Sequence, residues 1–315
     1  MTSASRQLVT RSGTIRLPAY VPVTTFGGKY PLDDLVRPYL PRLASAAMVS
    51  WHFAKQMDRK LPMPLFVDSG GFAALFETSR LSIRKGLGIL ETQTDDGEAE
   101  IIEPLAVLDL QEKIADVAFT LDFPIPPGLE QQEANRRKKL TIANALWALE
   151  NRRRKDLLLF GCIQCWDAKS AREVARSYKD AGFDGVAIGG LVPRSRDTEL
   201  VRQIVGAVRV EIPDLPLHCF GLGKPEIVQM LFEIGVDSVD SSSYLKLAAS
   251  GKLWTDPDCE IRDASISERM HLALCNLAAA AQTTLPLSAN RISFSTAALN
   301  ADRKQNPLQQ TSQPS

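Results

Sequence analysis

The sequence has no long apolar stretch and no excess of charge of either sign. No apolar run approaches the ~20 residues of a membrane-spanning helix, so we expect no membrane span. Residues 1–13 contain no apolar segment typical of a secretion signal. With 37 Lys+Arg against 37 Asp+Glu, the formal net charge is zero. The protein is therefore not strongly basic overall, which would be the simplest indication of nucleic-acid binding, but a local basic face remains open.

Cysteine is also scarce, with an odd count of five in 315 residues. A chain of this length does not need disulfides for stability, so we expect reduced thiols and a cytoplasmic protein. Cys162 and Cys165 form a C-x-x-C pair. A redox motif of this kind needs a helix N-terminus. Here the pair straddles the end of a predicted strand, which favours a role in lining a pocket.

The composition is that of an ordinary globular protein. Apolar residues make up 44% and charged residues 23%, which excludes wholesale disorder, collagen and coiled coil. The length allows two domains or one large α/β barrel. We expect a single domain over 1–299, followed by a polar, disordered tail over 300–315.

Short apolar runs rich in β-branched residues recur, mostly with a helical pattern between them. They predict strands at 18–24, 46–50, 64–68, 117–122, 157–163, 184–189, 216–220 and 236–240. Runs that are apolar throughout are typical of parallel strands buried on both faces. The sequence therefore predicts an α/β fold, a (β/α)8 TIM barrel, with a doubly wound open sheet as the alternative. Between strands three and four, alternating runs flank an Asp-Asp-Gly turn and predict an inserted β-hairpin.

Polar residues and glycines follow the predicted strands, where the active sites of such barrels lie. They include Asp68, Asp122, Gln164 and Asp240. One Asp alone is explained by a helix cap, but three carboxylates on one rim favour a site. Two carboxylates beside a glycosidic carbon can act as nucleophile and acid/base. A third carboxylate, together with the amide of a glutamine, can form hydrogen bonds with the edge of a purine base. The glycine turns also suit a phosphate, so a phosphate-binding isomerase or lyase is an alternative.

Five segments together resemble the tRNA-guanine transglycosylase family: VDSGGFAAL, AFTLDFPIP, LFGCIQCW, VAIGGLV and GVDSVDSSSY. The resemblance implies a (β/α)8 barrel in which Asp240 is the nucleophile and Asp68 the general acid/base. It implies that Asp122 and Gln164 bind the base. The further substrate-binding residues that it implies are His52, Ser69, Gly70, Gly71, Phe72, Gly189, Gly190 and Leu191.

The activity implied is base exchange in a nucleic acid. Asp240 would attack C1′ and displace guanine, forming a covalent glycosyl-enzyme. A free 7-deazaguanine, deprotonated by Asp68, would then attack C1′, and two inversions give retention. No cofactor is expected, and a homodimer or a partner subunit is possible. The alternative that is not an enzyme is a non-catalytic partner subunit of a transglycosylase, which would keep the fold and bind the nucleic acid.

The sequence departs from the family pattern at its zinc site. The family's C-x-C-x-x-C triplet is absent, and Cys275-Asn276 stands where a His-Asn pair is usual. Cys259, His271 and Cys275 offer three ligands, whereas structural zinc normally has four. We therefore expect no structural zinc.

Two further departures concern the polymer. The arginine-bearing loop after the nucleophile reads Ser-Tyr-Leu-Lys-Leu-Ala, and Pro193 to Arg196 replace a Glu after the Gly-Gly-Leu turn. We predict that Arg194 and Arg196 contact phosphate, whereas the basic runs 136–139 and 152–155 are solvated helix faces. These changes resemble those of DNA-acting relatives. They favour DNA over tRNA as the substrate, with tRNA left open.

Overall fold

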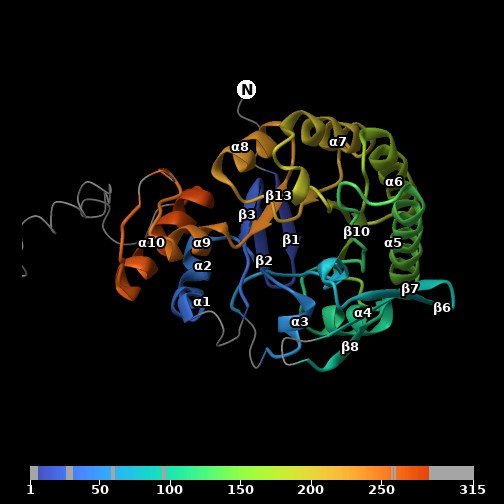
Figure 1. Ribbon diagram of the computed structural model, residues 1–315, viewed down its shortest axis with the longest axis horizontal. Helices are drawn as coiled ribbons and strands as arrows, with labels where there is room; N and C mark the ends of the chain where they lie inside the picture. Colours follow the sequence, from blue (N-terminus) through green and yellow to red (C-terminus); the bar gives the residue numbers. More distant parts are fainter. Residues whose placement is uncertain are drawn as a thin grey trace, which may run out of the picture.

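Eight parallel strands form the centre of the molecule (Figure 1). In spatial order they are β3 (Ala19–Pro22), β13 (Ser238–Ser241), β12 (Leu217–Cys219), β11 (Gly185–Ile188), β10 (Leu158–Ile163), β9 (Val117–Phe119), β5 (Leu65–Val67) and β4 (Ala47–Val49). A parallel bridge between Val23 and Met48 joins the two outer strands, β3 and β4. The (β/α)8 barrel is confirmed, and the open-sheet alternative is wrong. This computed structural model describes residues 6–25, 31–57, 61–93, 97–256, 258 and 260–283.

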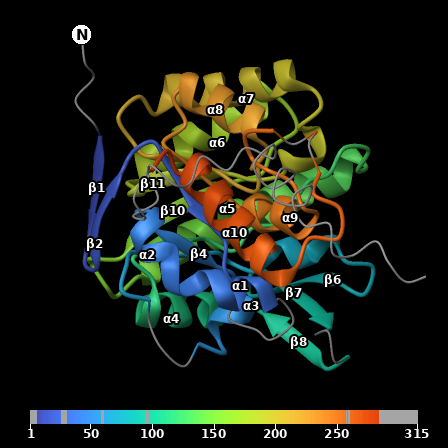
Figure 2. The same cartoon turned by 90° about the vertical axis from the view of Figure 1, so that its left-hand side faces the viewer.

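Helices surround the barrel. They are α1 (Pro31–Val36), α2 (Leu40–Leu43), α3 (Trp51–Ala54), α4 (Pro104–Ile114), α5 (Gln131–Asn151), α6 (Ala168–Ala181), α7 (Thr198–Glu211), α8 (Pro225–Glu233), α9 (Ser243–Ala249) and α10 (Ile266–Ala280). Short 3-10 turns are η1 (Arg37–Tyr39), η2 (Gly71–Leu75) and η3 (Val192–Arg194). Figure 2 shows α1, α9 and α10 packed together against one side. None of the helices in the described ranges has the length and apolar character that crossing a bilayer requires.

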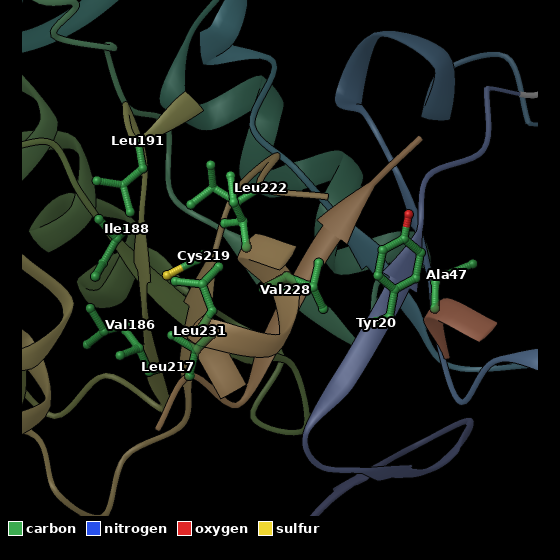
Figure 3. Packing of buried hydrophobic residues seen from close by; sticks show 14 of the residues in the cluster. Tyr20, Ala47, Val186, Ile188, Leu191, Leu217, Cys219, Leu222, Val228 and Leu231 are labelled. Carbon is green, nitrogen blue, oxygen red and sulfur yellow. The ribbon is translucent and has the colours of Figure 1, made fainter. Parts of the chain in front are cut away.

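The strands alternate between two hydrophobic clusters, as residues on opposite faces of a strand must. One cluster fills the barrel and includes Phe66, Phe119 and Phe160. The other lies between strands and helices; Figure 3 shows Leu217 and Cys219 of β12 beside residues of α8. A side chain between two outward-facing neighbours therefore points into the barrel.

The N-terminal hairpin covers one end of the barrel. It consists of β1 (Gln7–Thr10) and β2 (Gly13–Arg16), which pair antiparallel. Ile15 is fully buried in the cluster inside the barrel, and Ser12 N–H donates to the Asp116 carboxylate before β9. The hairpin thus covers the end where the strands begin, and the site is left at the other end.

The insertion between β5 and β9 is a three-stranded antiparallel sheet. The predicted hairpin is present as β7 (Leu87–Gln93) and β8 (Ala99–Ile102), although part of its turn, 94–96, lies outside the described residues. A further strand, β6 (Arg80–Arg84), was not predicted. It is joined to β7 by Lys85 and Gly86, both at positive φ (52° and 82°). Such a turn favours a hairpin, but a lysine at its first position is a weak signal.

The predicted tail at 300–315 lies outside the described residues, as does the end of the predicted domain after 283. The domain boundary and the disorder of the tail therefore stay predictions.

Candidate active site

Asp240 lies on β13 with its carboxylate held by two donors. Its Oδ1 accepts hydrogen bonds from Gly221 N (3.0 Å) and from His218 Nε2 (3.1 Å). His218 is fully buried, and its Nδ1 lies 2.8 Å from Ser238 Oγ. Both contacts to Asp240 use the same oxygen. Among the described residues, Oδ2 has no hydrogen-bond partner and is the oxygen left for a substrate.

Asp68 follows β5 directly and lies on the same rim. One of its oxygens, Oδ1, accepts from Trp51 N (3.0 Å) and Gly70 N (2.9 Å). Burial, helped by the negative charges of Asp240 and Asp122, raises the pKa of Asp68 to about 7, although the hydrogen bonds from Trp51 and Gly70 act to lower it. The three carboxylates are therefore near enough to interact. A carboxyl group with a pKa near 7 can both give and take a proton at neutral pH.

Asp122, which follows β9, is buried and fixed by side chains from two other strand ends. Its Oδ1 accepts from Ser69 Oγ (3.0 Å) and its Oδ2 from Gln164 Nε2 (2.6 Å). Gln164 is oriented in turn, because its Oε1 accepts from Ile125 N (3.2 Å). Burial raises the pKa of Asp122. Since a carboxylate has about four lone-pair positions, Asp122 can still accept from N–H groups of a ligand.

Two glycines allow these loops to approach closely. A Cβ on Gly71 would lie 2.0 Å from the Asp122 carbonyl oxygen, and one on Gly189 would lie 2.1 Å from Gln164 Nε2. Gly70 and Gly190 have positive φ, 74° and 72°, which favours glycine. The predicted glycines are therefore placed with Asp122 and Gln164.

The remaining predicted base-site residues differ in exposure. Ser69 and Leu191 are buried, whereas Phe72 is 63% exposed and meets Phe76 edge-on at 6.0 Å between ring centroids. His52 lies on α3, and its Nδ1 is 3.1 Å from Glu100 Oε2 of β8. His52 therefore links the rim to the inserted sheet, and its role in substrate binding stays a prediction.

Arg194 follows the Gly190 turn on the rim and is largely buried. It is only 7% exposed, and its Nη1 donates to the carbonyls of Ile125 (2.8 Å) and Gly190 (2.6 Å). Nη1 is thus held by the Ile125 and Gly190 carbonyls, and the phosphate contact of Arg194 stays a prediction. The sequence showed the rim position of Arg194 but not its burial. Arg196 is exposed, and its phosphate contact stays a prediction.

The basic runs 136–139 and 152–155 take part in internal contacts. Arg136 and Arg137 both pair with Glu133, and Arg137 also donates to Pro124 O. Arg153 pairs with Glu112, and Arg154 donates to the Glu112 and Ala115 carbonyls at the end of α4. The second run thus ties the end of α5 to α4, so it is more than a solvated face.

The residues considered for zinc are only partly described. Cys259 lies outside the described residues. His271 Nε2 lies 3.3 Å from Cys275 Sγ on α10. Among the residues that the structure describes, no three His, Cys, Asp or Glu side chains gather as a metal ion would need. Asn276 has a structural role, since it accepts from Trp254 N (2.6 Å) and donates to the Tyr244 and Lys252 carbonyls.

Comparison with known proteins identifies the family. A family model described as "Queuine tRNA-ribosyltransferase" matches residues 45–286, which is most of the chain. The chain belongs to the tRNA-guanine transglycosylase family. The family resemblance of the sequence motifs is thereby confirmed.

Two curated relatives are archaeal proteins named tRNA-guanine(15) transglycosylase. The one from Methanococcus aeolicus is 32% identical over 177 residues, 52% of this chain and 27% of the relative. The one from Methanocaldococcus jannaschii is 31% identical over 174 residues, 51% of this chain and 25% of the relative. The matched region thus spans about a quarter of the length of these relatives. They are glycosyltransferases by name.

Proposed function

We propose that this protein is a guanine transglycosylase that exchanges a guanine of a nucleic acid for a free 7-deazaguanine. The observation that carries the proposal is that three carboxylates lie on one rim in three different environments. Asp240 keeps one oxygen free, Asp68 has a pKa near 7, and Asp122 is fixed beside Gln164. A phosphate-binding isomerase or lyase has no use for this arrangement. A non-catalytic subunit has no need of the raised pKa at Asp68.

The chemistry consists of two displacements at C1′ of the nucleoside. In the first, the C1′–N9 bond breaks as Asp240 bonds to C1′, and Asp68 gives a proton to the departing guanine. In the second, Asp68 takes a proton from the incoming base, which bonds to C1′ and releases the Asp240 carboxylate. Each step inverts C1′, so the product retains the original configuration. Protons and electrons balance without a cofactor.

Asp122 and Gln164 hold whichever base is present. A purine presents N–H groups that need acceptors, and the Asp122 carboxylate supplies them. Ser69 and Gln164 fix its orientation. In a duplex the target base must leave the stack, which requires a few kcal/mol.

DNA is the polymer that we favour. The segment after Asp240 forms α9, and its only basic residue is Lys246, so the arginines expected of a tRNA-binding loop are missing. The test is to incubate the protein with radiolabelled guanine and either bulk tRNA or genomic DNA. Label in DNA supports this choice, label in tRNA alone contradicts it, and label in neither contradicts base exchange.

A groove lies between α6 and α7, two neighbouring helices labelled in Figure 1, and it suits the polymer backbone. It has a volume of about 520 Å³, and its charged lining residues are Lys169, Arg172 and Arg202. Two of its lining residues, Ala168 and Lys169, begin α6, which starts four residues after Gln164. Lysines and arginines along such a path bind phosphates without regard to sequence.

We expect replacement of Lys169 and Arg202 with Ala to weaken polymer binding. The slope of log K against log[salt] should fall by about one for each lost phosphate contact. The control is Lys179→Ala, at the far end of α6 and also exposed, which should leave the slope unchanged. If the double variant and Lys179→Ala have the same salt slope, the groove does not bind the polymer backbone. Titration of labelled DNA at several salt concentrations measures this.

The two rim arginines should behave differently. Arg196→Ala should reduce the salt slope of polymer binding, since Arg196 is exposed. Arg194→Ala should instead weaken binding of free guanine, because it loses the contacts that fix the Gly190 turn. Equilibrium binding of labelled guanine and of DNA to both variants separates the roles. A reduced salt slope in Arg194→Ala would show instead that Arg194 contacts a phosphate.

We also propose that the protein folds without a structural zinc. Metal analysis of protein purified without added zinc should give well below one equivalent per chain. Chelator should leave the melting temperature unchanged. One equivalent of zinc together with a lower melting temperature in chelator would contradict this.

A further inference from the structure

A histidine stands inside the barrel beside the carboxylate that attacks. His218 lies between Leu217 and Cys219 of β12, whose side chains pack outward near α8 (Figure 3). Alternation along the strand therefore turns His218 inward. It is fully buried, with the rings of Phe119 and Phe220 at centroid distances of 4.9 and 4.8 Å. An apolar side chain would suit these rings better, so the imidazole must gain from specific hydrogen bonds.

The hydrogen bonds of His218 define its proton positions. A neutral imidazole has one donor and one acceptor nitrogen. The ionised Asp240 carboxylate can only accept, so Nε2 carries the proton that it donates to Oδ1 at 3.1 Å. Nδ1 then accepts from the Ser238 hydroxyl at 2.8 Å. His218 and Ser238 are register partners on β12 and β13, and Ser238 and Asp240 share one strand face.

We propose that His218 positions Asp240 so that Oδ2 is the atom that attacks C1′. The inference rests on the proposed function, in which Asp240 is the nucleophile. His218 Nε2–H and Gly221 N–H both bind Oδ1 and so fix the plane of the carboxylate. The C1′–Oδ2 bond forms as the C1′–N9 bond breaks, and Oδ1 becomes the carbonyl oxygen of the glycosyl ester.

The same two donors act again when the ester breaks. As the incoming base bonds to C1′, the electrons of the C1′–Oδ2 bond return to Asp240. Negative charge then spreads onto Oδ1, where the two N–H groups already point. Fixed donors aimed at a developing charge stabilise a transition state without reorganisation. His218 therefore acts in the first half-reaction by orienting Oδ2 and in the second by stabilising the carboxylate that leaves, without touching the substrate.

The test compares variants that keep or lose the donor. His218→Leu has no donor, whereas His218→Gln can place an amide N–H near the former position of Nε2. We expect His218→Leu to lower kcat about 10- to 100-fold, the range for a hydrogen bond to a charged group. KM for the free base should stay the same, since Asp122 and Gln164 are unchanged. His218→Gln should recover most of kcat, and Ser238→Ala should lose less than His218→Leu.

Two further measurements separate this role from a structural one. The rate of covalent intermediate formation in a single turnover should fall in His218→Leu, while labelled guanine binding and the melting transition of His218→Gln match wild type. The proposal is overturned if His218→Leu keeps the wild-type kcat. It is also overturned if a folded His218→Gln that binds base is as slow as His218→Leu. Failure of wild-type protein to label any polymer overturns the proposed function, and the role of His218 falls with it.

Discussion

Replacing Asp240 with Asn is expected to abolish both base exchange and formation of a covalent intermediate. The neutral amide is a poor nucleophile, and it cannot form the ester from which a carboxylate would leave in the second displacement. The fold should survive, because the amide oxygen can still accept from Gly221 N and His218 Nε2. Incorporation of labelled guanine and gel trapping of the protein–nucleic acid adduct measure the two losses.

The matched control for Asp240→Asn is Asp237→Asn on the same segment. Asp237 pairs with Arg6 and Arg209, so its loss should lower stability without removing covalent trapping. Exchange by Asp240→Asn at a rate near that of wild type would show that another group attacks C1′.

Asp68→Asn should lower turnover by about 10² to 10⁴, the usual contribution of a general acid/base. Base binding should persist, because Asp122 and Gln164 are untouched. The wild-type pH–rate profile should bend near pH 7, where Asp68 titrates, and this bend should vanish in the variant. A variant that keeps the wild-type profile would remove this role from Asp68. Steady-state rates between pH 5 and 9 supply the comparison.

The raised pKa of Asp68 also predicts how stability changes with pH. The folded protein holds the Asp68 proton up to about pH 7, whereas the ordinary carboxyl value is 3.8. The favourable contribution is complete below pH 3.8 and is lost as the pH rises through 7. Asp68→Asn should therefore gain unfolding free energy relative to wild type between pH 5 and pH 8. Urea denaturation at both values tests the sign.

Most of the barrel was predictable because its strands are short apolar runs bounded by turn residues. All eight predicted strands overlap observed ones, and the β7–β8 hairpin was readable from alternation around its turn. β6 was missed, since a lysine in a left-handed conformation gives little sequence signal. Tertiary pairing with β7 decides its structure.

The sequence predicted which side chains lie on the rim, from their positions along the strands, but not the hydrogen-bond partners of each side chain. The sequence placed Asp68, Asp122 and Asp240 at strand ends, where the structure has them. It missed His218, although a polar residue between outward-facing Leu217 and Cys219 in a buried strand was an available signal. It also gave no sign that Arg194 is largely buried. The carbonyls that bury this arginine come from Gly190 and Ile125, and the latter is distant in sequence.

The most direct test of the account is to identify the protein residue that becomes covalently attached to nucleic acid. Wild-type protein would be mixed with DNA or tRNA, quenched with acid, digested with protease and nuclease, and analysed by mass spectrometry. The account predicts a pentosyl group on the Asp240 carboxylate, and its disappearance when excess free guanine is added before the quench. A pentosyl group on another residue, or base exchange without any adduct, would contradict it.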